Sequence, residues 1–190
     1  PGLGSMEDVI VNEELAWGDP GFATAAYATA LACAPIITGA TDEQKDIWLR
    51  KVAEEGALAS YAVTEPGAGS DLAACKTHAV RDGDDYVING AKMWITGAGH
   101  ADFFFVLAKT DIDAGYRGMS GFIVESDSEG FSLGKKETNM GQRCSDTRSM
   151  TFDDVRVPAA NLIGGSESGG RLNAMKAVDM ARPNIAAHAP

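Results

Sequence analysis

The chain has 190 residues and a formal net charge of −11 at pH 7. Its hydrophobic and charged fractions, 45% and 23%, are typical of a water-soluble globular protein. The negative charge disfavours general binding to nucleic acid or anionic membranes, and we expect no apolar stretch that spans a bilayer. The three cysteines and three histidines are widely spaced, which predicts free thiols, no metal site, and histidines in loops or on the surface.

Residues 1–59 predict helices, because alanine and glutamate are frequent and strand-like alternation is absent. A first helix over residues 8–17 is separated by a glycine- and proline-rich breaker from a second over residues 22–37. The second is almost uncharged, which is typical of a buried core helix. Thr41 and Gln44 match a capping box and predict a third helix that runs to about residue 55.

Residues 60–157 predict short strands separated by turns. Two hairpin signals, Asp82-Gly83-Asp84-Asp85 and Asn89-Gly90, flank a short strand. Short strands at regular spacing indicate a barrel or a sandwich. The expected strands are residues 86–88, 103–108, 121–125, 131–133 and 150–157.

A glycine- and serine-rich turn precedes a last predicted helix over residues 171–189. Leu172, Met175 and Val178 fall on one face of this helix, and we expect that face to be exposed in a chain of this extent. Pro183 is expected to kink or end the helix.

The first segment with chemical potential is residues 61–71, YAVTEPGAGSD. Its glycines allow a tight turn, which would present backbone amides and the hydroxyls of Thr64 and Ser70 to a phosphate or to the polar edge of a ring. A plain surface turn is the alternative. The spacing fits neither a Walker loop nor a dinucleotide-binding fingerprint.

The second segment is residues 89–98, NGAKMWITGA. Trp94 offers a flat face for stacking on a ring, and Thr96 offers a hydroxyl to a heteroatom. The alternative interpretation of a strand tryptophan is a core position.

Two further segments are polar. Residues 139–148, NMGQRCSDTR, predict a loop before the last strand, whose plainest role is a salt-bridged connection. Asp179 and Arg182 are three residues apart on the last helix, so an ion pair within that helix is their plainest interpretation.

The order of these motifs resembles that of the acyl-CoA dehydrogenase family over nearly the whole chain, and most closely its medium- and short-chain branch. The resemblance implies an α+β fold with an N-terminal helical segment, a middle β-barrel or sandwich domain, and the first helix of a C-terminal helical bundle. The corresponding domains are residues 1–59, residues 60–157 and residues 158–190. The chain resembles a fragment that lacks the start of the first domain and most of the third.

The resemblance also implies FAD and a set of binding residues. Thr64 would hydrogen-bond the pyrimidine side of the flavin, Trp94 would pack at the ring, and the Thr96 hydroxyl would face N5. Gly69 and Ser70 would lie by the pyrophosphate and the substrate entrance. The implied cofactor-binding residues are Tyr61, Val63, Thr64, Gly69, Ser70, Trp94, Ile95 and Thr96, the implied substrate-binding residues are Ser70, Asp179 and Arg182, and no metal is implied.

The implied reaction is α,β-dehydrogenation of acyl-CoA thioesters to trans-2-enoyl-CoA, with electrons passed to an electron-transfer flavoprotein. The family's glutamate base has no counterpart in this chain and is expected beyond Pro190. Glu65 belongs to the flavin turn and is not a substitute, so we expect the isolated chain to be inactive. The resemblance further implies a homotetramer, and it places the protein in the bacterial cytoplasm or the mitochondrial matrix.

Three alternatives stay open. An oxidase relative would pass electrons to oxygen, and access to the flavin would decide between it and a dehydrogenase. A non-catalytic acyl-CoA or flavin binder would be a natural chain that ends at Pro190. A β-barrel interaction module would leave the paired motifs without a role.

Overall fold

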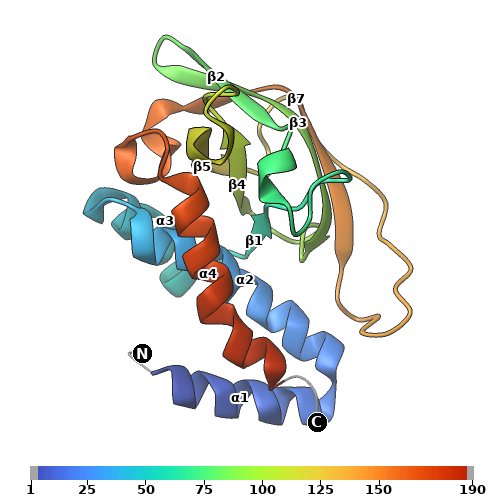
Figure 1. Ribbon diagram of the computed structural model, residues 1–190. Helices are drawn as coiled ribbons and strands as arrows, with labels where there is room; N and C mark the ends of the chain where they lie inside the picture. The colour runs from blue at the N-terminus through green and yellow to red at the C-terminus, as the bar shows by residue number, and fades with distance from the viewer. Residues whose placement is uncertain (1–3, 188–190) are drawn as a thin grey trace.

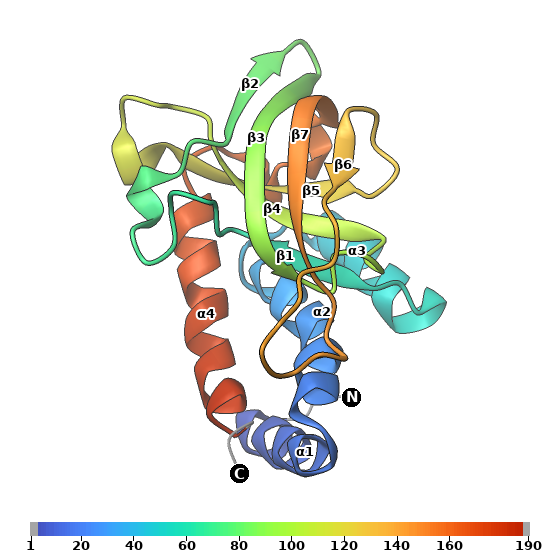
Figure 2. The ribbon, with the colours of Figure 1, turned by 90° about the vertical axis from the view of Figure 1, so that its right-hand side faces the viewer.

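The computed structural model describes residues 4–187, in which four helices pack beside a curled seven-stranded sheet (Figures 1 and 2). His188 lies outside the described residues. The expected α+β class is confirmed, with helices first, a strand-rich middle and a helix at the C-terminal end. The helices are α1 (Ser5–Gly18), α2 (Pro20–Gly39), α3 (Asp42–Glu55) and α4 (Gly170–Ala186).

Local capping sets the ends of the first three helices. Asp19 is the single residue between α1 and α2, and its side chain accepts a hydrogen bond of 2.7 Å from the amide of Phe22. The predicted breaker is therefore a helix cap, so α2 begins two residues earlier than expected. The capping box of α3 is confirmed, since Thr41 and Gln44 each accept a hydrogen bond from the other's backbone amide.

Helix α2 corrects two expectations. It is buried on one side only, because Ala32 and Ile36 are in the core while Phe22 and Ile37 are at least half exposed. Among the described residues it is also the one helix whose length and apolar composition would allow a membrane span, contrary to the expectation of none. In this structure the buried side of α2 packs against α4 and the sheet.

The sheet is mixed and curls around its own core (Figure 2). Its strand order is β1-β4-β2-β3-β7-β6, and β5 pairs with β4. The β1–β4 and β2–β4 pairs are parallel, and the other pairs are antiparallel. The strands are β1 (Ala59–Ala62), β2 (His78–Asp82), β3 (Asp85–Thr96), β4 (Phe103–Lys109), β5 (Met119–Glu125), β6 (Phe131–Leu133) and β7 (Thr147–Pro158).

One of the two predicted hairpins is wrong. The turn at Gly83 joins β2 to β3 as expected, but β3 continues through Asn89 and Gly90 without turning. Gly90 has a φ of 145°, and a Cβ there would lie 2.5 Å from Oγ1 of Thr77. The glycine therefore allows a bulge and a close approach of two chain segments, which its local sequence cannot distinguish from a turn.

Strand β4 separates two hydrophobic clusters. Phe104 and Val106 point into the curl of the sheet, and Phe103 and Phe105 point toward the helices. Both faces of β4 are buried, which explains its uninterrupted apolar sequence. The cluster that contains Phe103 and Phe105 joins the helices to the sheet.

Helix α4 packs through small residues. Ala174, Ala177 and Ala181 are buried, whereas Leu172 is 58% exposed. Of the face expected to be exposed, Leu172 is exposed, whereas Met175 and Val178 are partly buried. Met180 and Ile185 are further exposed apolar side chains of α4. Pro183 does not end the helix, which continues to Ala186, because only a last short stretch follows the missing amide.

Candidate functional site

A pocket of about 210 Å³ lies where α2 meets the ends of β1 and β3. We call it the Trp94 pocket. It brings together five of the eight residues expected to bind a cofactor, although they come from two motifs about thirty residues apart in the sequence. Its lining residues are Ala28, Leu31, Tyr61, Thr64, Trp94, Ile95 and Thr96.

Trp94 reaches this pocket because β3 contains a second irregularity. The pairing of β3 with β7 shifts register between Lys92 and Ile95, and Trp94 has a φ of 62°. This left-handed conformation is unfavourable for a tryptophan, and it takes Trp94 out of the regular pairing of β3 with β7. The indole is 55% exposed, so the core interpretation of Trp94 is wrong.

The TEPGAGSD segment forms a closed turn beside this bulge. Glu65 and Ala68 exchange backbone hydrogen bonds of 2.9 and 3.2 Å. The Met93 amide donates a 2.9 Å hydrogen bond to the carbonyl of Thr64. The two motifs therefore meet backbone to backbone at the rim of the pocket.

The chemistry of the pocket fits a flat heteroaromatic ring. Within residues 4–187, the hydroxyls of Thr64 and Thr96 make no hydrogen bond to the protein and are available to a ligand. Trp94 and Tyr61 provide aromatic surface beside them. A ring with nitrogen and oxygen atoms along its edge, such as a flavin, matches this combination of donors and stacking surface.

Asp146 holds the loop that follows Thr96, a role that the sequence did not indicate. Its carboxylate accepts hydrogen bonds of 2.7 Å from the Gly99 amide and 3.0 Å from Nε of Arg148, and its carbonyl accepts one from Gly97. Burial raises the pKa of Asp146, but these hydrogen bonds outweigh it and hold the pKa below its usual range. Asp146 is therefore a carboxylate that holds the loop directly after Thr96.

Tyr61 and Val63 occupy different environments. The Tyr61 hydroxyl donates a 2.9 Å hydrogen bond to the carbonyl of Ala174 on α4, and burial raises the pKa of that hydroxyl above its usual range. Val63 is buried in the core between sheet and helices, so its side chain does not line the pocket. Val63 therefore does not line the Trp94 pocket, whereas Tyr61 and Thr64 do.

A second pocket, of about 200 Å³, places Ser70 beside two residues that the motifs did not indicate. The guanidinium of Arg171 lies 4.8 Å from the ring centroid of Tyr116, and both residues line the pocket. Gly69 does not line it. An arginine directly after a glycine-rich turn, at the start of a helix, is the signal from which this site could have been found.

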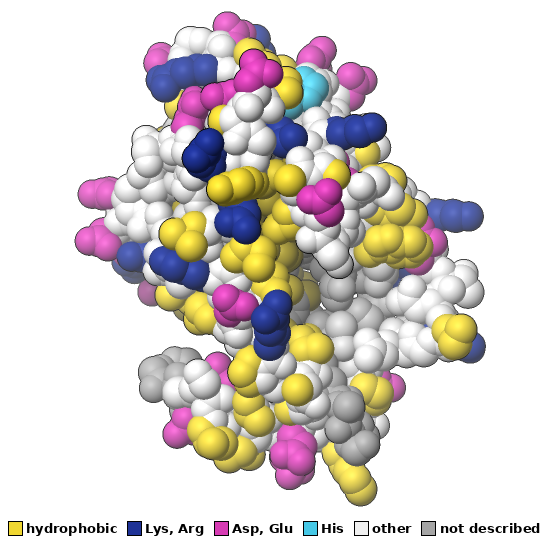
Figure 3. Space-filling model, in the orientation of Figure 1, with side chains coloured by type: hydrophobic (Ala, Val, Ile, Leu, Met, Phe, Trp, Pro, Cys, Tyr) yellow, Lys and Arg dark blue, Asp and Glu magenta, His cyan; other side chains and the backbone are white. Residues whose placement is uncertain are grey.

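Asp179 and Arg182 form the expected ion pair on α4, with 3.3 Å between Nη1 and Oδ1. Arg182 also lines an apolar groove of about 470 Å³ between α4 and α2, together with Leu31, Val178 and Ile185. Leu31 borders the Trp94 pocket as well, so the groove and the pocket adjoin. Figure 3 shows hydrophobic side chains gathered over the middle of the face that carries α4.

Glu65 is not placed to act as a base. Its side chain is almost fully buried, 2.9 Å from Nζ of Lys92, and it does not line the Trp94 pocket. Across residues 4–187 there is no cluster of histidine, cysteine and carboxylate side chains that could hold a metal. Cys33, Cys75 and Cys144 are free thiols, as expected.

Comparison with known proteins places the chain among acyl-CoA dehydrogenases. The family model described as the acyl-CoA dehydrogenase middle domain matches residues 60–155, and the model of the N-terminal domain matches residues 1–56. A probable medium-chain specific acyl-CoA dehydrogenase 2, mitochondrial, from Caenorhabditis briggsae is 47% identical over 100% of this chain and 47% of its own length.

Solved structures agree. The butyryl-CoA dehydrogenase of Megasphaera elsdenii superposes with a TM-score of 0.94 and 39% identity, over 98% of this chain and 49% of that one. A chain from a structure described as the electron transferring flavoprotein of Acidaminococcus fermentans also has a TM-score of 0.94 and 39% identity, over 99% of this chain and 50% of that one. The chain spans about half the length of these relatives.

Proposed function

Because the chain belongs to the acyl-CoA dehydrogenase family, we propose that it forms the FAD-binding part of an enzyme that converts acyl-CoA thioesters to trans-2-enoyl-CoA. The observation that carries this proposal is the Trp94 pocket, in which two uncommitted hydroxyls lie beside an exposed indole. The pocket matches the part of the site that a flavin ring would require. In the proposed domain division, residues 1–59 and 158–190 flank the flavin-binding domain of residues 60–157.

In this proposal Thr64, Trp94 and Thr96 hold the flavin ring, and the turn at Gly69 and Ser70 lies toward the pyrophosphate. Val63 and Ile95 support the site from within the core, where both side chains are buried. Bound FAD would supply the chemistry of accepting a hydride from the substrate. The protein's own contribution is to orient the ring and to keep hydrogen-bond donors at its edge.

The acyl-CoA would bind along α4. Ser70 and Arg171 line one pocket, and Arg182 lines the apolar groove, so each guanidinium could donate hydrogen bonds to phosphate oxygens of the substrate. The groove itself would receive apolar parts of the substrate. Asp179 would orient Arg182 through their ion pair.

The proton-accepting base would come from outside the Trp94 pocket. No carboxylate lines that pocket among residues 4–187, and Glu65 is occupied by Lys92. We therefore expect the isolated chain to bind FAD without turning over acyl-CoA.

The family membership supports the wider setting of this proposal. Electrons would pass to an electron-transfer flavoprotein, and the exposed apolar side chains of α4 would be covered in a homotetramer. Relatives include a mitochondrial protein and bacterial ones, which supports a place in the mitochondrial matrix or the bacterial cytoplasm.

Titration of the chain with FAD tests the proposal, with quenching of flavin fluorescence as the measurement. Thr64→Val and Thr96→Val each remove one hydroxyl and should weaken binding about tenfold. Thr151→Val, at an exposed position of β7 that does not line the Trp94 pocket, is the matched control and should leave the affinity unchanged. Absence of FAD binding by the unmodified chain would contradict the proposal.

Addition of acyl-CoA without oxygen then tests the expected lack of turnover. Retention of the oxidised flavin spectrum is the expected result. Bleaching by the isolated chain would show that it contains a base. In a full-length enzyme, rapid reoxidation by air would indicate an oxidase, and reoxidation by an electron-transfer flavoprotein would indicate a dehydrogenase.

A further inference from the structure

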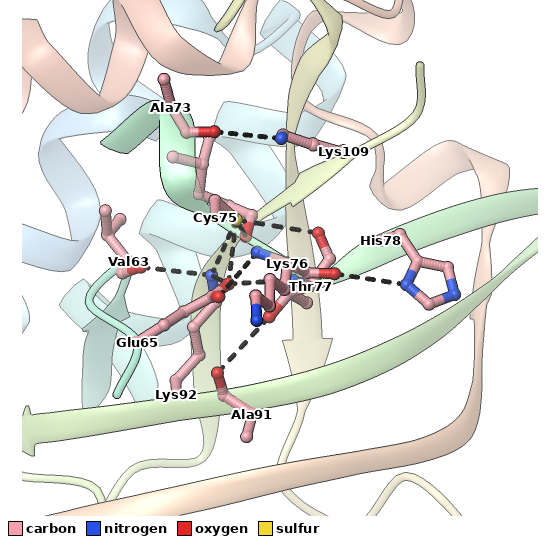
Figure 4. Close-up of polar contacts among 11 residues, drawn as sticks. Val63, Glu65, Ala73, Cys75, Lys76, Thr77, His78, Ala91, Lys92 and Lys109 are labelled. Carbon is pink, nitrogen blue, oxygen red and sulfur yellow. Dashed lines mark hydrogen bonds and ion pairs between the residues drawn. The ribbon is translucent and has the colours of Figure 1, made fainter. Parts of the chain in front are cut away.

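Lys92 is fully buried, which is unusual for a lysine and which the proposed chemistry does not use (Figure 4). Its ammonium lies 2.9 Å from Oε1 of Glu65, and it donates a 3.2 Å hydrogen bond to the carbonyl of Val63. The sulfur of Cys75 is 3.7 Å away. A buried ion pair carries a large desolvation cost, so its presence beside the cofactor motifs calls for a role.

The contacts of Lys92 surround Thr64 on both sides. Val63 and Glu65 are the residues directly before and after Thr64, and both are held by the Lys92 ammonium. Thr64 itself accepts the backbone hydrogen bond from Met93, the residue after Lys92. Two successive residues of β3 therefore hold three successive residues of the turn.

Glu65 is in turn held by hydrogen bonds from residues 75–77. Its carboxylate accepts hydrogen bonds from the amides of Lys76 and Thr77, at 2.7 and 3.0 Å, and from the Cys75 thiol at 2.9 Å. Figure 4 shows these donors and the Lys92 ammonium converging on the Glu65 side chain. The carboxylate is thus held in one position, which makes it a rigid anchor for Lys92.

Lys92 is also the last residue of β3 that pairs with β7 before the bulge that carries Trp94. Anchoring its side chain fixes where the strand leaves the regular ladder. The strained backbone of Trp94 requires such an anchor, since a left-handed tryptophan persists only where its surroundings hold it.

We propose that Lys92, held by Glu65, is a positioning residue that sets Thr64 and Trp94 relative to each other in the Trp94 pocket. This inference rests on the proposed binding of a flavin there. Its structural part, the placement of Trp94, does not require the cofactor, so the two proposals can fail separately.

The test uses the charge-free double variant Glu65→Gln/Lys92→Met beside the single variant Lys92→Met. The single variant leaves a buried carboxylate without its cation and is expected to be destabilised. The double variant removes both charges and keeps one oxygen at position 65, which can accept from one of the two backbone amides. It should therefore regain part of the lost stability. It still lacks the donor that holds Val63 and the turn.

The readout is the ¹⁹F NMR spectrum of protein labelled with 5-fluorotryptophan. The chain has 3 tryptophans, and the resonance of Trp94 is assigned as the one absent from Trp94→Phe. The expected result for the double variant is a shifted or broadened Trp94 resonance, with those of Trp17 and Trp48 unchanged. The FAD dissociation constant should rise about tenfold.

Lys51→Met is the matched control, because it breaks another lysine–glutamate pair of 2.9 Å, at Glu125, away from the pocket. Lys51→Met should leave the Trp94 resonance and the FAD affinity unchanged. Because the Lys51 ammonium lies 4.8 Å from the centroid of the Trp48 ring, only the Trp48 resonance should shift. A Trp94 resonance and an FAD affinity in the double variant equal to those of the unmodified chain would overturn the inference and leave the pair a purely structural role. If the unmodified chain binds no FAD, the flavin proposal fails and the Trp94 resonance alone decides this one.

Discussion

The backbone amide of Met93 donates a 2.9 Å hydrogen bond to the carbonyl of Thr64, inside the irregular stretch of β3 that also contains Trp94. This contact joins the two motifs whose side chains line the pocket. The bulge that follows places Trp94 at a φ of 62°, where only glycine is free of strain.

Substitution of Trp94 tests that strain. Trp94→Gly and Trp94→Ala remove the same indole, but only alanine keeps a Cβ in the left-handed region. We expect Trp94→Gly to be more stable than Trp94→Ala by about 1 kcal/mol, measured by urea unfolding. Within an ordinary strand the order is reversed, so a more stable alanine variant would contradict the bulge. Both variants should bind FAD more weakly than the unmodified chain.

The Glu65–Lys92 pair predicts a loss of stability in acid. Burial raises the pKa of Glu65, but Lys92 and the hydrogen bonds outweigh it and lower the pKa to about 2, from 4.5. Because the folded pKa is the lower one, the stabilisation is complete above about pH 4.5 and is lost as the pH falls toward 2. The free energy of unfolding should fall by about 3 kcal/mol over that range.

The control for this prediction is the double variant Glu65→Gln/Lys92→Met, which has no group to titrate at this site. Urea unfolding at several pH values should show a shallower acid dependence in the double variant. Parallel curves for the two proteins would show that Glu65 does not contribute.

Gly170 tests how α4 docks on the sheet. A Cβ at Gly170 would lie 2.3 Å from the carbonyl carbon of Ser120 on β5, so the helix would have to move. We expect Gly170→Ala to lower the unfolding free energy by about 2 kcal/mol. Gly169→Ala is the matched control, because its Cβ would meet nothing closer than 3.9 Å, and it should change stability by less than about 0.5 kcal/mol.

Asp146 predicts a local effect on the loop after Thr96. Asp146→Asn removes the charge that pairs with Arg148 and weakens the hydrogen bond to the Gly99 amide. That amide should exchange its hydrogen at least about tenfold faster, measured by NMR in deuterated water. Asp153→Asn, at an exposed carboxylate on β7, should leave the exchange rate unchanged. Equal protection of Gly99 in Asp146→Asn would show that its carboxylate does not hold the loop.

Substitution of Arg182 should weaken substrate binding without changing the stability of the protein. Its ion pair with Asp179 is largely exposed, so Arg182→Ala should change the unfolding free energy by less than about 0.5 kcal/mol. If the groove along α4 receives acyl-CoA, calorimetric titration should show weaker binding by the variant. Arg50→Ala, which breaks exposed ion pairs on α3, should bind acyl-CoA as the unmodified chain does.

Local sequence signals were sufficient for most elements. Thr41 and Gln44 define the start of α3, and their two hydrogen bonds join residues only three apart in the sequence. The buried strands β4 and β5 were likewise expected from their continuous apolar residues. Such features are predictable because the groups that decide them are close in sequence.

The sequence by itself determined the family resemblance, the helical and strand regions, and the residue types available at the Trp94 pocket. Only the tertiary structure decided that Gly90 bends a strand without turning it, that Trp94 is exposed, and that Glu65 is paired with Lys92. Each of these depends on a partner far along the chain: Thr77 for Gly90, β7 for Trp94, and Lys92 for Glu65. Local propensity carries no information about such contacts, because their energy exists only once the distant segments have been brought together.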